Sequence, residues 1–196
     1  MSKIKVILSD LDGVIRHYPG SQAEAALGLE AGGLLSFAFQ KKYLEPAITG
    51  ITTDEHWREQ IATELALRFD KDKVGQIIGQ WTAFPGQLDE QVFNLYKDKA
   101  QNSDCKIALL TNGTSKLKSD LKILGIIDDF DFIYNTSEIG FAKPDARTFH
   151  HVLNTIGYAA HEILFVDDRE ENTKMAHSLG FNVHHFKNYH ELKKII

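Results

Sequence analysis

The sequence predicts an α/β protein built on a doubly wound parallel sheet, with a small helical insertion near its N-terminus. Short aliphatic runs recur along the chain, and each of them ends in polar residues and is followed by a helical pattern. Nearly all of the roughly one hundred residues between the first two runs have helical periodicity, and this length is too great for a single crossover. The runs therefore predict parallel strands, and the long gap predicts an inserted helical unit.

The first predicted strand covers residues 3–8, and it leads directly into Asp10, Asp12 and Gly13. Residues two apart on a strand point to the same side, so the two carboxylates should be directed at one spot. Gly13 allows the chain to turn sharply afterwards. Ligands of open α/β sheets bind at the carboxyl ends of strands, so this pair suggests chemistry, whereas an ordinary acidic turn is the alternative for this segment alone.

Helical periodicity dominates the insertion. Apolar residues recur every four positions from Trp57 to Leu65, after Thr53, which is a residue type suited to cap a helix. A second helical pattern covers residues 74–81, and Pro85 with the following glycine marks a break before the next helix. We therefore predict a helical cap at residues 16–85 and a core made of residues 1–15 and 86–196.

The second aliphatic run, at residues 106–110, ends in Thr111 and Asn112 before a helical pattern that starts at Leu117. A hydroxyl and small polar groups at a strand-to-helix junction offer hydrogen-bond donors beside a helix N-terminus, which is a favourable place for a phosphate. The same residues are also common in simple turns and helix caps.

Two further segments add charge. Lys143 precedes Pro144, which restrains it towards an extended conformation. Residues 163–166 form another aliphatic run that leads directly into Asp167 and Asp168. If this strand neighbours the first one, four acids converge at one sheet edge.

Such a cluster requires compensation. Two carboxylates about 4 Å apart repel by ~1 kcal/mol in water and by ~4 kcal/mol at an effective dielectric constant near 20. A cation must occupy the cluster, or some of the acids must stay protonated. Hard oxygen ligands without Cys or His favour Mg²⁺. Together with one lysine and a hydroxyl-bearing junction, the pattern indicates a phosphoryl-transfer site.

The order Asp-x-Asp-Gly-Val, Thr-Asn-Gly, Lys-Pro and Val-Asp-Asp-x-x-x-Asn resembles the haloacid dehalogenase superfamily of phosphohydrolases, and the matching segments span residues 10–172. The resemblance implies a Rossmann-like core with a helical cap after the first motif, Mg²⁺ as cofactor, and hydrolysis of a small phosphomonoester. The implied roles are Asp10 as the nucleophile that forms an aspartyl-phosphate, Asp12 as general acid and base, Thr111 and Asn112 as phosphate ligands, Lys143 as the neutralising cation, Asp168 with Asp10 and the Asp12 carbonyl as metal ligands, Asp167 as a direct or water-mediated ligand, and Asn172 as a support for these ligands.

Three other interpretations compete with a phosphatase. The first motif also resembles that of β-phosphoglucomutases, although residues 16–19 depart from the loop of those enzymes. Dehalogenases of the superfamily generally lack the second aspartate and the metal site, so Asp12 argues against them. A non-enzymatic phosphoacceptor or binding domain fits poorly with the large insertion. Within the phosphatase reading, residues 49–57 are similar to the cap of sugar-phosphate phosphatases.

Composition sets broad limits on the 196-residue chain. A net charge of −5 argues against nucleic acid as a partner and leaves a small phosphorylated metabolite as the expected one. No run is long enough to cross a membrane, and the lone Cys105 suits a reducing compartment, so we expect a cytoplasmic protein.

Arg16, His17 and Arg58 are plausible substrate contacts, although a solvated surface position is the more common one for such residues. The oligomeric state is left open.

Overall fold

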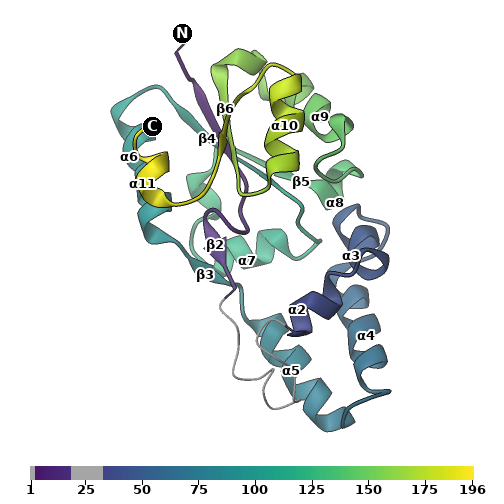
Figure 1. Cartoon of the computed structure of the whole chain (residues 1–196). Helices are drawn as coiled ribbons and strands as arrows, with labels where there is room; N and C mark the ends of the chain where they lie inside the picture. Colours follow the sequence, from purple (N-terminus) through teal and green to yellow (C-terminus); the bar gives the residue numbers. More distant parts are fainter. Residues whose placement is uncertain (1–2, 19–32) are drawn as a thin grey trace.

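The computed structural model describes residues 3–18 and 33–196, and its core is a five-stranded parallel sheet (Figure 1). The strand order is β5-β4-β1-β6-β7, and every neighbouring pair is parallel. The strands are β1 (Val6–Ser9), β4 (Lys106–Thr111), β5 (Phe132–Asn135), β6 (Ile163–Asp167) and β7 (Asn182–His185). The predicted α/β class with a doubly wound parallel sheet is confirmed.

Helices cover both faces of this sheet because successive strand residues point to opposite sides. Ile7 belongs to one buried cluster and Leu8 to the other. The first cluster includes residues of α6 (Glu90–Asn102), α7 (Leu117–Ile123) and α11 (Tyr189–Leu192), and the second includes residues of α9 (Ala146–Ile156) and α10 (Glu170–Ser178). Shorter elements complete the core: α8 (Thr136–Ile139), η1 (Ile127–Asp129) and η2 (Ala160–Glu162).

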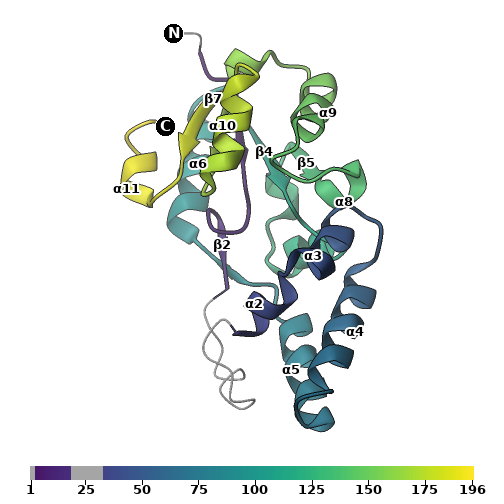
Figure 2. The same ribbon diagram turned by 45° about the vertical axis from the view of Figure 1, so that its right-hand side comes forward.

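The described part of the insertion is helical and has its own hydrophobic cluster, which is centred on Trp57 and Ile61. Its helices are α2 (Gly33–Ala38), α3 (Lys41–Ile48), α4 (Asp54–Leu65) and α5 (Lys71–Ala83). The antiparallel pair β2 (Arg16–His17) and β3 (Gln87–Leu88) lies where the chain leaves the core and returns to it. Figure 2 shows the four helices grouped at one end of the core. They lie within the predicted range 16–85, of which residues 19–32 fall outside the described residues.

Several local predictions can be compared with these elements. Thr53 caps α4 and accepts a hydrogen bond from the His56 N–H, as its residue type predicts. Strands β5 and β7 were not predicted, because their sequences, Phe-Ile-Tyr-Asn and Asn-Val-His-His, lack the aliphatic runs that indicate the other strands of the sheet. Among the described residues, no helix combines the length and the apolar character needed to cross a membrane.

Candidate active site

Because β1 and β6 are neighbouring strands, the acidic residues at their carboxyl ends lie together at the centre of the site. Ser9 is in register with Val166, so Asp10 and Asp167 leave neighbouring strand ends together. One carboxylate oxygen from each of Asp10, Asp167 and Asp168 lies within 4.8 Å of the others. The structure thus brings together three of the four acids that the sequence singles out.

The buried side chain of Lys143 neutralises part of the negative charge of these carboxylates. Its Nζ lies 2.9 Å from Asp10 Oδ2 and 2.7 Å from Asp167 Oδ2, and it donates to the Leu110 carbonyl over 2.8 Å. The side chain is buried, which by itself opposes the charged form, but the two carboxylates outweigh burial and raise the pKa of Lys143. Lys143 is therefore a buried cation with three oxygen atoms within 2.9 Å of its Nζ.

The carboxylates remain in excess. Burial raises the pKa of Asp10 to about 7; Asp167 adds to this rise and Lys143 opposes it. Burial, followed by the charge of Asp167, also raises the pKa of Asp168. Three ionised carboxylates against one ammonium leave two negative charges, the amount that one divalent cation offsets. An all-oxygen donor set with this surplus fits Mg²⁺.

Asp167 is held rigidly by its neighbours. Asn172 Nδ2 donates to both carboxylate oxygens, over 2.9 and 3.0 Å, and the Arg169 N–H donates to Oδ1 over 2.8 Å. Asn172 is itself buried on α10. Asn172 thus holds the carboxylate that shares Lys143 with Asp10, and its supporting role in catalysis stays a prediction.

Asp12 does not point into this acid cluster. Its Oδ1 accepts from Arg16 Nε over 2.6 Å and its Oδ2 accepts from Arg16 Nη2 over 2.9 Å. Gly13 turns the chain at φ +88°, and a Cβ at this position would collide with the Asp168 carboxylate. The extended alternation expected for both aspartates therefore ends at Asp10, and the turn directs Asp12 towards the cap.

Arg16 is a buried residue and not a solvated surface one. Its Nη1 also donates to the Pro85 carbonyl over 3.1 Å and to Asp120 Oδ2 over 3.3 Å. Burial opposes the charge of the guanidinium, but the charge and hydrogen bonds of Asp12, together with the charge of Asp120, raise the pKa of Arg16. Arg16 thus fixes Asp12 relative to α7, which carries Asp120, and to the returning chain at Pro85.

The two predicted phosphate ligands after β4 differ in their surroundings. Asn112 Oδ1 accepts from the Lys143 N–H over 2.8 Å, and its Nδ2 donates to the Lys143 carbonyl over 3.0 Å. This side chain therefore braces the Lys143 segment. Thr111 is buried at the end of β4. Phosphate binding by Thr111 and Asn112 stays a prediction.

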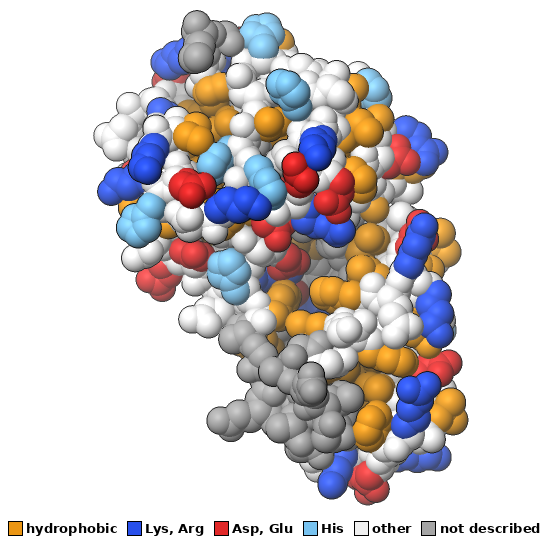
Figure 3. All heavy atoms as spheres, in the orientation of Figure 1, with side chains coloured by type: hydrophobic (Ala, Val, Ile, Leu, Met, Phe, Trp, Pro, Cys, Tyr) orange, Lys and Arg blue, Asp and Glu red, His pale blue; other side chains and the backbone are white. Residues whose placement is uncertain are grey.

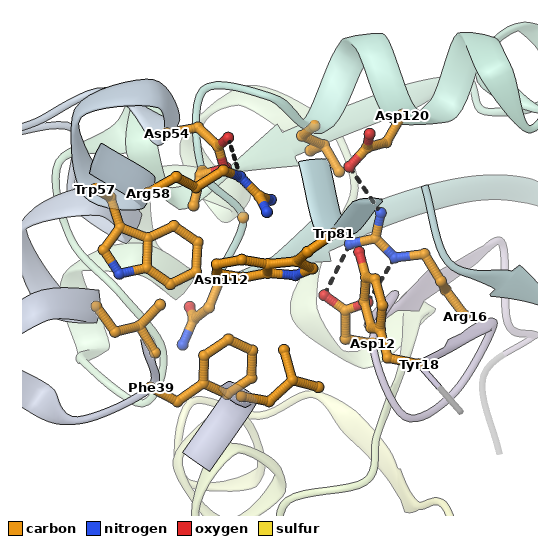
Figure 4. A pocket seen from close by; sticks show the side chains of 15 residues that line it. Asp12, Arg16, Tyr18, Phe39, Asp54, Trp57, Arg58, Trp81, Asn112 and Asp120 are labelled. Carbon is orange, nitrogen blue, oxygen red and sulfur yellow. Dashed lines mark hydrogen bonds and ion pairs between the residues drawn. The ribbon is translucent and has the colours of Figure 1, made fainter. Parts of the chain in front are cut away.

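A cavity of about 70 Å³ opens between the core and the cap next to Asp12 (Figure 4). Arg58 of α4 lies in its wall, paired with Asp54 through 2.6 and 3.4 Å contacts and stacked on the Trp81 ring at 3.8 Å. Asp54 also accepts from Thr114 Oγ1 over 2.7 Å, which joins the cap to the core. The space-filling view shows hydrophobic side chains around the hollow between the two parts (Figure 3).

The haloacid dehalogenase-like hydrolase family matches residues 4–180 of this chain. The chain belongs to this family. Membership agrees with the order of the four motifs and with the convergence of Asp10, Asp167, Asp168 and Lys143 at one sheet edge.

Three curated proteins show local similarity to this hydrolase. They are drimenol cyclase of Aspergillus calidoustus (35% identical over 48% of this chain and 18% of the cyclase), a sesquiterpene phosphatase of Aspergillus oryzae (42% over 27% of each chain), and the pyrimidine 5′-nucleotidase of Escherichia coli (29% over 45% of each chain). The chain therefore spans less than half the length of these relatives.

Solved structures share the fold of this hydrolase over most of their length. A Bacteroides thetaiotaomicron family enzyme in a magnesium complex has a TM-score of 0.71 and 20% identity, with 95% of this chain and 94% of that chain covered. A predicted family hydrolase of Porphyromonas gingivalis has a TM-score of 0.70 and 20% identity, with coverage of 99% and 98%. A dehalogenase has a TM-score of 0.73 and 16% identity, with coverage of 100% and 98%.

Arg16 and Arg58 of this hydrolase are buried, although a solvated surface position is the more common one for such residues. Arg16 and Arg58 each lie four residues after an aspartate, and each pairs with that aspartate in the structure. For Arg58 this spacing is a sequence signal, because Asp54 and Arg58 both lie on α4 and positions i and i+4 are neighbours along a helix. Asp12 and Arg16 are instead brought together by the turn that leads into β2. The spacing did not indicate burial, which depends on how the cap packs against the core. His17 is half exposed and lies 3.5 Å from Asp89.

Proposed function

We propose that this hydrolase is a Mg²⁺-dependent phosphatase that hydrolyses a small phosphomonoester through an aspartyl-phosphate on Asp10. The observation that carries the proposal is the environment of the Asp10 carboxylate. Its Oδ1 accepts from the Leu11 N–H over 2.7 Å, and its Oδ2 lies 2.9 Å from Lys143 Nζ. The names of the phosphatase and nucleotidase relatives and the magnesium complex of a structural neighbour support it.

In the first step, Asp10 attacks phosphorus, a bond from its carboxylate oxygen to phosphorus forms, and the bond from phosphorus to the ester oxygen breaks. Asp12 gives a proton to the departing oxygen, and it later takes one from the water that attacks the aspartyl-phosphate. Lys143 and the Leu11 N–H offset negative charge on Asp10 throughout. Bound Mg²⁺ supplies charge neutralisation for the phosphoryl group; Asp10, Asp168, the Asp12 carbonyl and, directly or through water, Asp167 would hold it.

Asp12 starts this sequence with both oxygens bonded to Arg16. One of these bonds must open before the carboxyl group can carry a proton to the leaving group. Because Arg16 also holds Asp120 and the Pro85 carbonyl, the guanidinium stays in place while Asp12 moves. Thr111 and Asn112 would hold phosphoryl oxygens, and the Asn112 side chain could do so only through the second hydrogen of its amide.

The expected substrate is a small metabolite, because a helical cap over the site excludes water and bulky polymers. The expected compartment is the cytoplasm, which suits the lone Cys105. The test is a screen of phosphorylated metabolites that measures released phosphate with and without Mg²⁺, with Asp10→Asn as the inactive control. Phosphate release that depends on Mg²⁺ and on Asp10 supports the proposal. Isomerisation of a sugar phosphate without phosphate release would instead identify a phosphomutase, and full activity after rigorous chelation would overturn the metal assignment.

A further inference from the structure

The wall of the cavity beyond Asp12 holds a cation with unused hydrogen-bonding capacity. Arg58 is 8% exposed, and its Nη1 is buried without a partner among the described residues. The guanidinium uses Nε and Nη2 for Asp54, and its central carbon lies 3.8 Å from the centre of the Trp81 ring. A buried donor on a charged group that lacks an acceptor is costly, so an acceptor is expected to occupy this position in the working enzyme.

The position of the cavity identifies which part of a substrate reaches Arg58. Asp12 and Arg58 line the same space, and Figure 4 shows both of them around it. Since Asp12 would protonate the departing oxygen, the group attached to that oxygen extends from Asp12 into this space. The remaining walls are mostly apolar or aromatic: Tyr18, Leu35, Phe39, Leu44, Trp57, Trp81 and Leu117.

The charges around the cavity are already paired. Asp12 pairs with Arg16, Asp54 pairs with Arg58, and Asp120 is shared by Arg16 and Lys116. No surplus positive charge is left among these residues for a second anionic group on the substrate. An uncharged acceptor is therefore the better match for Arg58 Nη1.

The polar groups of the walls are also largely committed. Asn112 bonds the Lys143 backbone, and Thr114 donates to Asp54. A leaving group with many hydroxyls would find few free partners here, and each unpaired hydroxyl would lose its hydrogen bonds to water. The cavity suits an apolar body with one acceptor better than a polyol.

We propose that Arg58 and Trp81 form a leaving-group site for an uncharged, largely apolar alcohol that carries one hydrogen-bond acceptor. The acceptor bonds Arg58 Nη1, and the apolar body packs on the aromatic walls. This inference rests on the proposed phosphatase activity and narrows its substrate class. It makes Arg58 a specificity residue for this part of the substrate.

The test uses two esters of matched shape, 4-acetylbenzyl phosphate and 4-ethylbenzyl phosphate, of which only the first carries a carbonyl acceptor. The methylene group separates the ring from the reacting oxygen, so the two alcohols have similar leaving ability. Arg58→Lys keeps a cation beside Asp54 but removes Nη1, the nitrogen that would bond the acceptor. Arg68→Lys is the matched control at an exposed cap position. We measure kcat/KM for both esters with each variant.

Wild-type enzyme and Arg68→Lys should prefer the acetyl ester, and Arg58→Lys should lower this preference by about tenfold, as loss of one hydrogen bond to a charged group predicts. A general folding defect lowers both rates and leaves the ratio unchanged. Trp81→Leu should instead lower kcat/KM for both esters alike, because both bodies lose the same packing surface.

If the ratio of kcat/KM for the acetyl ester to kcat/KM for the ethyl ester is unchanged in Arg58→Lys, the assignment of Arg58 is overturned. It is also overturned if the wild-type enzyme prefers a sugar phosphate or 4-carboxybenzyl phosphate to the acetyl ester. These outcomes leave the proposed function intact as long as wild-type enzyme releases phosphate from any ester and Asp10→Asn does not. If no ester is hydrolysed by the wild-type enzyme in Mg²⁺, the proposed function and this inference fall together.

Discussion

Replacing Asp10 by asparagine should stabilise the metal-free protein at neutral pH, although it removes the proposed nucleophile. The cluster formed by the buried residues Asp10, Asp167 and Lys143 and the exposed Asp168 has two negative charges in excess when all its groups are ionised. Asp10→Asn removes one of these charges and keeps the size and shape of the side chain. Folding then no longer has to bury that carboxylate in its charged form.

The magnitude follows from the pKa of Asp10, which rises from an ordinary value of 3.8 to about 7 in the folded protein. Between these two values the folded state binds more protons than the unfolded state, so wild-type stability falls as pH rises. The contribution of protonated Asp10 is fully present below about pH 4 and is lost by about pH 7. Each pKa unit corresponds to about 1.4 kcal/mol, which gives an upper limit of about 4 kcal/mol; this limit already includes the opposing effect of the ion pair with Lys143.

Urea unfolding in EDTA from about pH 4 to about pH 8 measures this effect as the difference in unfolding free energy between Asp10→Asn and wild type. The difference should be small at the acidic end and should grow with pH in favour of the variant. Adding Mg²⁺ at about pH 8 should stabilise wild type more than the variant, because the variant lacks a ligand and a charge. A difference that does not change with pH, or a variant that is less stable in EDTA at about pH 8, would refute the reasoning.

Three other predictions follow from the same geometry. Lys143→Met should destabilise the metal-free protein by about 3–5 kcal/mol in thermal or urea unfolding, because it leaves buried carboxylates without their cation; an unchanged stability would contradict the role of Lys143. Asp12→Asn should lose more activity on alkyl than on aryl phosphates in single-turnover kinetics, since aryl alcohols leave as stable anions, and an equal loss would argue against its acid role. Calcium should inhibit in a phosphate-release assay, because its larger, variable coordination sphere suits the site poorly, and full activity with calcium alone would contradict this.

The core and its acid cluster follow from features that are local in sequence. The runs before Asp10 and Asp167 are short, aliphatic and followed by polar residues, which fixes them as strands whose carboxyl ends can carry a site. The helix α4 follows from its four-residue apolar spacing and from Thr53. These predictions succeed because each depends on residues within one element or at its end. The cap boundaries at residues 16 and 85 and the roles of the individual site residues stay predictions.

Features that depend on packing between distant segments were not predictable in this way. The direction of Asp12 depends on Arg16, whose guanidinium is in turn held by Asp120 more than a hundred positions away. Asn112 braces Lys143 across 31 positions, so a single motif cannot show that its side chain is already engaged. Arg58 Nη1 has no partner among the described residues, and it is buried because the cap helices and the core pack around it. Sequence patterns identify these residues but not their partners.

The most direct test of the central claim is to map the phosphoryl group after a single turnover. Asp12→Asn enzyme, which should lack the base that activates water, is mixed with an aryl phosphate and Mg²⁺, quenched in acid, digested and analysed by mass spectrometry. We predict one phosphoryl group on Asp10, and none when Asp10 is also replaced by asparagine. A phosphoryl group on another residue, or phosphate release with no phosphorylated enzyme at any time point, would contradict Asp10 as the nucleophile.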